Sequence, residues 1–540
     1  MPSPNVSTEQ QIDPGKAIDE LIHWITGTTL HLALGLFIGT LAARLMRSRH
    51  LHWSWAAAAL AFVVLARTAL AGSALTLAVA AGFAAMRSRH WHHEDLTAGG
   101  DLFEIAANRI SPLDCLRRLG GSARRHCRLA VKPDSSITEN ELILGRDEQG
   151  RAVAVPFGGV HGGTHALVLG ATGSGKTVTQ TSMAVAAIKH GMGAVVIDPK
   201  GDAGLRAHLI SAAHAAGRPF LQWTPGGDAV YNPYARGSET EIADKALAAE
   251  RFTEPHYQRQ AQRYLGHAVR AMRSAGDEVS LAGIVRQLDP ACLETLARSL
   301  PEDEARSTHA YLDSLTARQQ SDLAGVRDRL AILSESDVGP WLDPQTVGAE
   351  RFDLLQAVRA KAVVYFGLES DSRPLLSQML GGAIVQDLQT VVASLQSQPV
   401  ATVVVIDEFS AVAAEQIVRL FGRARSAGVS LLLGTQELSD LRLPGRERLL
   451  EQVMGNLSLL IAHRQVVPAS AELIASVAGR RGAWKVSRSS DGRSTRTRTS
   501  EPLLDPNRVM RLGQGWGAVI VPGAPVGVRI THVFSPAQRD

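Results

Sequence analysis

The sequence predicts an α/β protein with a mostly parallel sheet, an all-α insertion and an N-terminal region of apolar helices. Three observations support this class. From residue 141 onward short apolar runs alternate with helical segments, more than a hundred residues of purely helical pattern interrupt the alternation, and long apolar stretches precede it. Continuous apolar runs indicate strands buried on both faces, as in parallel sheets connected by helices.

Size and composition indicate a globular protein with a membrane contribution. The chain has 540 residues, enough for about three domains. Its formal net charge is only +4, so any contact with nucleic acid must come from local basic patches. The spacing of the three cysteines, Cys115, Cys127 and Cys292, fits neither a zinc ribbon nor a disulfide framework, which favours reduced thiols.

The N-terminal region contains two apolar stretches that predict two or three membrane spans. Gly27 to Leu45 is almost wholly apolar, and Trp53 to Met86 is apolar except for Arg67 and small polar residues. A span needs about 20 apolar residues, so the second stretch is too long for one helix and barely long enough for two. The alternative is a buried helical hairpin in a soluble domain, which the lack of a polar face at a period of 3.6 disfavours.

Two basic clusters orient these spans. Arg44, Arg47 and Arg49 follow the first stretch, and Arg87 and Arg89 follow the second. Such clusters accumulate on the cytoplasmic side, and three spans with the N-terminus outside place both there. A cleaved signal peptide is not expected, because no basic segment precedes the first apolar run.

A phosphate-binding loop is the strongest motif. Ala166–Leu169 predicts a buried strand, GATGSGKT follows at 170–177, a helix is expected over 178–189, and Ala194–Ile197 predicts another strand. This strand–loop–helix context is what the motif G-x4-G-K-[ST] requires. The predicted nucleotide-binding residues are Gly170, Ala171, Thr172, Gly173, Ser174, Gly175, Lys176 and Thr177.

The residue types of this loop match the chemistry of a nucleotide triphosphate. The glycines let the backbone curl so that its N–H groups point at phosphate oxygens, and the helix N-terminus adds positive potential. Lys176 is expected to reach the β- and γ-phosphates, and the Thr177 hydroxyl to ligate Mg²⁺. The sequence therefore predicts ATP and Mg²⁺ as ligands.

A second buried strand ends in two carboxylates. Thr402–Ile406 is followed by Asp407 and Glu408. Asp407 fits the acid that holds Mg²⁺ through its ligand shell, and Glu408 fits the base that polarises the attacking water. The alternative, a solvated turn, is disfavoured by the β-branched run that precedes the pair.

A third predicted strand, 429–433, leads to Gln436, which could reach the γ-phosphate or orient the water. Before it lie Arg423 and Arg425. An arginine at a subunit edge could act on a neighbour's nucleotide, or it could be a helix C-terminal residue favoured by the dipole. The segment Asp198–Asp202 ends the strand predicted over 194–197, where it either lines the site or only turns the chain.

Four motifs together resemble a known family. GATGSGKT, VVIDPKGD (195–202), VVVIDEFSA (403–411) and RARSAGVSLLLGTQ (423–436) are similar to the conjugative coupling ATPases of type IV secretion, the TraG/TraD family. That family belongs to the HerA/FtsK class of ring-forming DNA motors, and the resemblance covers about residues 140–535. It implies a RecA-like P-loop core, Gln436 as sensor, and Arg425 rather than Arg423 as the finger.

The resemblance also implies a function and partners. Members are expected to form homo-hexamers, to use ATP, and to bring DNA to a type IV secretion channel. The DNA is expected to be single-stranded and bound to a relaxase. The expected location is the bacterial inner membrane, with several spans and the ATPase part in the cytoplasm.

A helical insertion supports the coupling-protein branch of the HerA/FtsK class. Between strands at 218–223 and 362–366 the sequence reads as helices and resembles the all-α domain of coupling proteins. The expected helices are 241–248, 258–274, 281–287, 293–299, 305–313 and 318–333. A basic series with helical spacing, Arg259, Arg263, Arg270 and Arg273, is interpreted as a solvated face, with a DNA contact as the alternative.

The expected domains are a membrane anchor (1–90), a juxtamembrane linker (91–140), the first part of the nucleotide-binding core (141–237), the all-α insertion (238–350) and the second part of the core (351–540). Strands near 516–521 and 526–531 close the core, with no acidic tail after them. The basic, polar stretch 485–499 is interpreted as a mobile loop, or as a contact to DNA phosphates.

Several other functions fit parts of the pattern. An FtsK-type chromosome translocase shares the motifs but not the helical insertion. A secretion ATPase that does not handle DNA would differ by lacking DNA-stimulated hydrolysis. A non-enzymatic scaffold is disfavoured by Glu408, and a transporter ATPase is disfavoured by the lack of an LSGGQ-type signature. A kinase is disfavoured because the motif at 195–202 and Gln436 match a motor instead.

Overall fold

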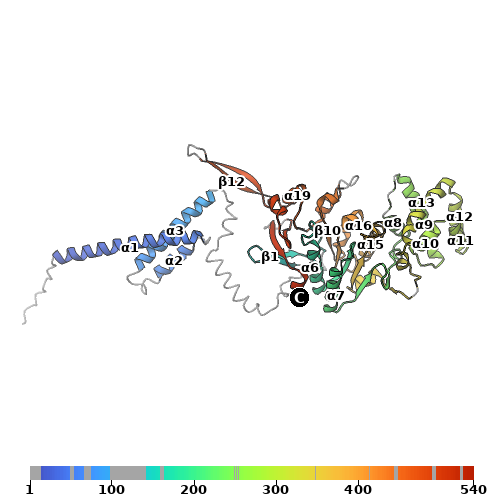
Figure 1. Cartoon of the computed structure of the whole chain (residues 1–540), viewed down its shortest axis with the longest axis horizontal. Coiled ribbons are helices and arrows are strands. Elements are labelled where there is room, and N and C mark those ends of the chain that lie inside the picture. The colour runs from blue at the N-terminus through green and yellow to red at the C-terminus, as the bar shows by residue number, and fades with distance from the viewer. Residues whose placement is uncertain are drawn as a thin grey trace, which may run out of the picture. The chain divides into compact units, whose positions relative to one another are not determined.

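The computed structural model (Figure 1) divides into two compact units, which we describe separately. One consists of Met1–Lys132 with Arg480–Glu501, and the other of Pro133–Gly479 with Pro502–Asp540. The structure describes residues 14–48, 54–65, 74–97, 141–158, 163–248, 250, 252, 254–346, 348–412, 414–442, 448–488, 494–522 and 527–539.

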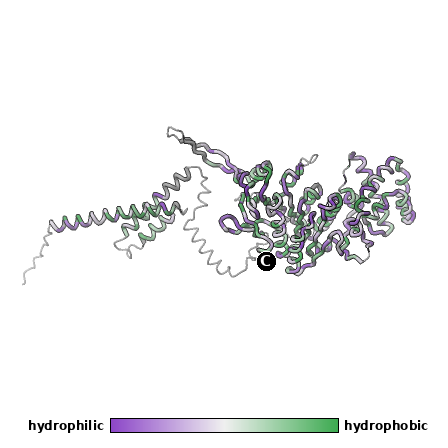
Figure 2. Tube along the Cα trace, viewed as in Figure 1, coloured by the Kyte–Doolittle hydropathy of each residue, from purple (hydrophilic) through white to green (hydrophobic). Residues whose placement is uncertain are grey.

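Three N-terminal helices, α1 (Pro14–Ser48), α2 (Ser54–Leu65) and α3 (Ala74–Thr97), carry long hydrophobic runs (Figure 2). α1 packs closely on α3 because Gly35 and Gly39 lie at the contact. A Cβ at Gly39 would lie 2.7 Å from the Ala80 carbonyl oxygen, and one at Gly35 2.8 Å from the Val79 Cβ. Small residues four apart allow such close helix approach in membranes.

One of these helices is long and apolar enough to cross a membrane, judged by length and composition alone. It covers Ile18–Met46, 29 residues, while Ser54–Val64 and Ala74–Ser88 are shorter apolar helices. The described helices thus contain one candidate span rather than the two or three expected. α3 continues to Thr97, and the rest of the expected linker, 98–140, lies outside the described residues.

Residues 485–488 and 494–499 of the basic stretch are strands, so the interpretation as a mobile loop was wrong for them, and residues 489–493 lie outside the described residues. β12 (Arg480–Arg488) and β13 (Ser494–Pro502) pair as a two-stranded sheet. The Arg480 guanidinium donates to the Ser500 hydroxyl at 2.9 Å and to the Ser500 carbonyl at 2.7 Å. Alternating Arg and Thr suits an extended strand through the β-branched threonines, but it lacks the apolar face that marks most strands.

The second unit is built on an 11-stranded sheet ordered β2-β1-β15-β14-β11-β3-β10-β9-β4-β8-β5. The strands are β1 (Glu141–Asp147), β2 (Ala152–Pro156), β3 (Ala166–Leu169), β4 (Gly193–Asp198), β5 (Phe220–Trp223), β8 (Val363–Gly367), β9 (Thr402–Ile406), β10 (Val429–Thr435), β11 (Leu459–Ala462), β14 (Trp516–Ile520) and β15 (Val528–Val533). The predicted hairpin of β1 and β2 and the predicted buried strands are confirmed.

The seven strands from β11 to β5 are mutually parallel, and β14, β15, β1 and β2 extend the sheet as antiparallel strands. Hydrophobic residues alternate between two core clusters, one on each face of the sheet. β10 lies between β3 and β9, so the carboxyl ends of these three strands meet at one edge. Residues that follow them along the chain are therefore brought together there.

Helices cover the sheet and connect its strands. They are α6 (Lys176–Lys189), α7 (Ala203–Ala215), α14 (Leu354–Arg359), α15 (Pro374–Ser394), α16 (Phe409–Val412), α17 (Ala414–Ala424), α18 (Leu449–Asn456), α19 (Pro468–Ala478) and α20 (Pro506–Met510). A short parallel pair, β6 (Ala229–Val230) with β7 (Glu350–Arg351), joins the chain on either side of the insertion.

In the described part of the insertion lie six α-helices, as predicted, with boundaries shifted by up to three residues. They are α8 (Glu239–Ala246), α9 (Pro255–Ser274), α10 (Leu281–Gln287), α11 (Pro290–Ala297), α12 (Glu302–Asp313) and α13 (Ala317–Ser334). The four arginines of the basic series lie on the exposed side of α9. Arg263 stacks over the Tyr311 ring at 4.7 Å, so this member has a packing role.

A buried ion pair connects the insertion to the core. Lys245 of α8 is 1% exposed and donates to Asp387 of α15 at 2.7 Å and to the Pro233 carbonyl at 3.0 Å. The Tyr231 hydroxyl donates to the other Asp387 oxygen at 2.6 Å. Burial lowers the pKa of Lys245, and the Asp387 charge offsets part of this effect. The ammonium is thus fully enclosed by its partners.

We predict that Lys245→Met lowers stability strongly, because it leaves the Asp387 carboxylate buried without a counter-charge. A loss of about 3–5 kcal/mol is expected, measured as a shift in the urea unfolding midpoint of the purified chain. Lys245→Met combined with Asp387→Leu should recover much of that loss. If the double variant were as unstable as the single variant, the cost would come from packing and not from the unpaired charge.

Candidate nucleotide-binding site

The loop 170–177 adopts the curled backbone that phosphate binding needs. It connects β3 to α6, and Gly173 and Gly175 have φ of 75° and 110°, in the left-handed region that favours glycine. Gly175 is the N-cap of α6, and no side chain caps the helix. The first amides of α6 therefore remain available to an anion at the helix N-terminus. The Ser174 hydroxyl is buried without a partner among the described residues, which fits a polar ligand in the loop.

The end of β11 and the turn before β14 support this loop from behind. The Ala171 amide donates to the Arg464 carbonyl at 3.1 Å, and the Gly515 amide donates to the Ser174 carbonyl at 3.0 Å. Sequence reasoning missed these residues because they lie some 300 residues from the loop and carry no motif. The lone signal is Gly515, whose φ of 77° requires a glycine.

His463, the first residue after β11, lies beneath the loop in a fixed neutral form. Its Nδ1 is 2.9 Å from the Trp516 carbonyl oxygen, which can only accept, so Nδ1 carries the proton. Its Nε2, 2.8 Å away, then accepts from the Thr179 hydroxyl of α6. Burial, together with the nearby Lys176 charge, lowers the pKa of His463 to about 4. The ring therefore couples α6 to the supporting strands without adding charge.

The predicted charged residues converge at the edge where β3, β10 and β9 end. Lys176 forms an ion pair with Asp407, and its Nζ lies 3.2 Å from Glu408 Oε1. The Thr177 hydroxyl is 3.5 Å from Asp407 Oδ2. Neighbouring ligands of an octahedral Mg²⁺ lie roughly 3 Å apart, given metal–oxygen distances of about 2.1 Å. A hydroxyl and a carboxylate at this spacing fit the oxygen ligands that Mg²⁺ prefers, so Thr177 and Asp407 are the residues that would hold it.

Glu408 is surrounded by donors. Gln436 Nε2 lies 3.0 Å and Lys200 Nζ 3.1 Å from its Oε1. Burial alone would raise the pKa of Glu408, but the Lys176 charge and the hydrogen bonds from Gln436 and Lys200 hold it below its ordinary value. The backbone of Glu408 has φ of 44°, an unusual value for this residue type that costs about 1–3 kcal/mol. This turn aims the carboxylate at the loop.

The segment Asp198–Asp202, whose role the sequence left open, lines the site. Asp198 is buried and accepts from the Lys200 amide at 3.0 Å, the Asp202 amide at 2.6 Å and the Tyr365 hydroxyl at 2.8 Å. Burial raises the pKa of Asp198 despite these hydrogen bonds. Its carboxylate shapes the turn that presents the Lys200 side chain to Glu408.

Arg425 is not part of this cluster. It lies between α17 and the start of β10, is exposed, and donates to the Ser458 hydroxyl at 3.3 Å. β10 is seven residues long and spans about 23 Å. Because Gln436 follows the other end of β10, Arg425 cannot reach the nucleotide site of its own chain.

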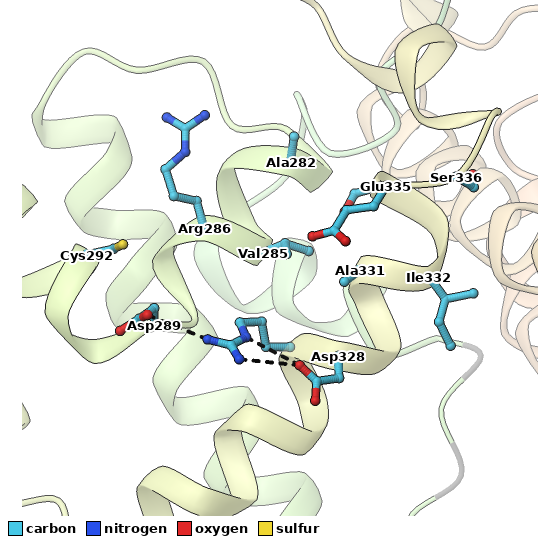
Figure 3. A pocket seen from close by; sticks show the side chains of 12 residues that line it. Ala282, Val285, Arg286, Asp289, Cys292, Asp328, Ala331, Ile332, Glu335 and Ser336 are labelled. Atoms are coloured by element: carbon cyan, nitrogen blue, oxygen red, sulfur yellow. Dashed lines mark hydrogen bonds and ion pairs between the residues drawn. The ribbon is translucent and has the colours of Figure 1, made fainter.

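A separate cavity of 820 Å³ lies in the insertion, between α10, the start of α11 and α13 (Figure 3). Arg327 lies there between Asp289, at 3.5 Å, and Asp328, at 3.4 Å. Asp289 also caps α11 by accepting from the Ala291 amide. These charges therefore stabilise the helix packing, and we assign no chemistry to this cavity.

Parts of the chain are similar to known proteins in sequence. Residues 401–514 match the family described as the TraM recognition site of TraD and TraG. Residues 162–337 match the family described as the central domain of the helicase HerA. A segment of 55 residues is 46% identical to the type 4 coupling protein DotL of Legionella pneumophila. That segment is 10% of this chain and spans only 7% of DotL.

Solved structures of coupling proteins share the fold. The bacterial conjugative coupling protein TrwBdeltaN70 is similar over 76% of this chain and 92% of its own, with a TM-score of 0.55 and 16% identity. The plasmid coupling protein TrwB in complex with ADP and Mg²⁺ is similar over 70% and 87%, with a TM-score of 0.51 and 17% identity. At such identities the likeness concerns the fold.

The fold and the family matches define a RecA-like protein of the P-loop ATPase class. Within that class the chain is similar to type IV coupling proteins, in the segment that matches TraD and TraG, in the segment shared with DotL and in its TrwB-like fold.

We predict that stability falls as the pH drops from about 6.5 towards 4, because two buried histidines stay neutral in the folded chain. The His165 ring donates through Nε2 to the Phe421 carbonyl and accepts through Nδ1 from the Leu431 amide. Burial lowers the pKa of His165 to about 4, and the pKa of His463 is lowered to about the same value. In the unfolded chain both histidines bind protons at the ordinary histidine pKa of 6.5, so the unfolded chain takes up more protons than the folded chain and acid favours unfolding.

The measurement is the thermal unfolding midpoint at several pH values in that range. The double variant His165→Gln, His463→Gln should start from a lower midpoint but lose less of it on acidification. A slope equal to that of the unmodified chain would show that other groups cause the acid sensitivity.

Proposed function

We propose that this protein is a membrane-anchored, ATP-driven DNA motor that couples conjugative DNA transfer to a type IV secretion channel. The observation that carries the proposal is the convergence of Lys176, Asp407, Glu408 and Gln436 on one edge of the sheet, beside a phosphate-binding loop. This is the set of groups that ATP hydrolysis by a P-loop enzyme needs.

Each residue has a role that its position supports. The amides of the loop and Lys176 bind the phosphates, and Thr177 with Asp407 holds Mg²⁺, which neutralises charge on the phosphates. Glu408, kept ionised by its donors, accepts the proton of the attacking water. Gln436 contacts both Glu408 and, at 3.4 Å, the Thr172 hydroxyl, so it links the base to the loop.

The type of motor is inferred from the matched families. TraD, TraG, DotL and TrwB are coupling proteins, and HerA is a helicase, so we infer single-stranded DNA with a relaxase-bound complex, type IV secretion components and a homo-hexameric ring as partners. An FtsK-type translocase and a secretion ATPase that does not handle DNA are the alternatives. The six-helix insertion favours the coupling protein.

We further propose an anchor in the bacterial inner membrane, with the ATPase part in the cytoplasm. The candidate span in α1 and the basic residues that follow it support this orientation. A multi-pass anchor would require α2 and α3 to enter the membrane as well. We assign residues 1–90 to the anchor, 91–140 to the linker, 141–237 and 351–540 to the ATPase core, and 238–350 to the insertion.

Lys176→Ala should abolish ATP turnover, because the γ-phosphate loses its cation. We expect at least about a 100-fold lower turnover number, measured as phosphate release by the purified chain with and without single-stranded and double-stranded DNA. Stimulation of the unmodified protein by DNA supports a DNA motor. Turnover without any response to DNA would favour the secretion ATPase, and normal turnover by Lys176→Ala would refute the site.

Arg425→Ala should spare nucleotide binding and abolish turnover, because we propose that Arg425 acts on a neighbour's site and it lies far from the site of its own chain. The loss expected for removing such a finger is about 10³-fold or more. Arg423→Ala, which changes an exposed arginine two residues away, is the matched control.

Mixed rings separate the two interpretations of Arg425. Subunits with Arg425→Ala should regain turnover at their own site when their neighbours keep Arg425 and carry Lys176→Ala instead. If no mixture of these two inactive variants hydrolyses ATP, Arg425 does not act between subunits.

A further inference from the structure

Glu408 is held by Lys200, a residue to which the proposed function assigns no role. Lys200 follows β4 and lies on the far side of β9 from the phosphate-binding loop. Its Nζ is 3.1 Å from Glu408 Oε1, the same oxygen that lies 3.2 Å from Lys176 Nζ and 3.0 Å from Gln436 Nε2. Three donors from three strand ends therefore converge on one oxygen atom.

The second carboxylate oxygen of Glu408, Oε2, has different surroundings. Within the described part of the chain, no hydrogen bond or ion pair falls on Glu408 Oε2. The carboxylate is thus fixed through one oxygen, and the other remains available to a water molecule. A general base needs this arrangement, because the oxygen that takes the proton must be within hydrogen-bond reach of it.

Lys176 cannot serve as the permanent holder of Glu408. Its ammonium is required at the phosphates when nucleotide is bound. Once Lys176 turns to the phosphates, Lys200 is the remaining cation among these contacts, and Gln436 the remaining neutral donor. The side chain of Lys200 is 46% exposed, so it is free of the tight packing that a structural lysine such as Lys245 shows.

The turn that carries Lys200 is built to keep it in place. Besides the three bonds to Asp198, the Leu368 amide donates to the Asp198 carbonyl at 3.0 Å and the Ser370 amide to the Pro199 carbonyl at 2.6 Å. β4 and the segment after β8 thus clamp the turn from both sides. Such support is what holds a functional side chain in a productive geometry.

We propose that Lys200 is a positioning residue that holds the Glu408 carboxylate by Oε1, so that Oε2 is left to the attacking water when Lys176 moves to the phosphates. The proposal rests on the proposed function, because it assumes that Glu408 is the base. It assigns the Asp198–Asp202 segment to control of the base and not to contact with nucleotide.

The test compares Lys200→Met with Lys200→Arg in the full chain, using ATP turnover, ADP affinity and trapping by ADP with aluminium fluoride. Lys200→Met should lower kcat about 10- to 100-fold, since loss of positioning has costs of this size. The Kd for ADP should change less than twofold, trapping with aluminium fluoride should weaken, and Lys200→Arg should restore most of kcat. Lys189→Met, at the far end of α6 about 20 Å from Lys176, is the control.

Two further variants give the decisive outcomes. Glu408→Gln should be inactive, and adding Lys200→Met to it should cost nothing more, because the holder acts only through the base. If Glu408→Gln has no ATP turnover and Lys200→Met has normal turnover, the positioning role of Lys200 is refuted and the proposed base is not. Normal turnover by Glu408→Gln overturns the proposed base. A tenfold weaker Kd for ADP with unchanged kcat in Lys200→Met would make Lys200 a nucleotide contact instead.

Discussion

The ion-pair cluster of Lys176, Asp407 and Glu408 is the constraint on which the core depends. All three side chains are at most 12% exposed, and buried charges are tolerated only when each has a partner. The strand order supplies the partners: β10 separates β3 from β9, so Gln436 lies between the loop and the carboxylates. A ligand that draws Lys176 away must therefore leave Glu408 with other donors, which the turn after β4 and the end of β10 provide.

The loop itself depends on parts of the chain that carry no motif. The ends of β11 and β14 hold it through backbone bonds to Arg464 and Gly515 and through the neutral ring of His463. A neutral group suits this position, because a second positive charge there would repel the Lys176 ammonium. The antiparallel extension of the sheet is thus a structural support for the site.

Sequence patterns predicted the strands that are buried on both faces, because continuous apolar runs leave few alternatives, and they predicted the motif residues at the strand ends. They failed where polarity hides an element: the Arg- and Thr-rich strand β13 has no apolar face to mark it. They could not assign Lys200, because its role depends on where Asp198 and Tyr365 direct the turn. They also could not decide the number of spans, since α2 and the apolar part of α3 are short.

The position of Arg425 has a consequence for any assembly. One chain contains the phosphate loop and the residues that we propose to bind Mg²⁺, to act as the base and to hold the base. Arg425, by contrast, stands exposed at the opposite end of β10. If Arg425 completes a neighbour's site, hydrolysis becomes conditional on subunit contact. α17, which leads to Arg425, packs on α15, and α15 holds the insertion through Asp387 and Lys245. A continuous set of packed helices thus connects the insertion to the residue that would act on the next subunit, and it is one physical route by which the insertion could influence hydrolysis.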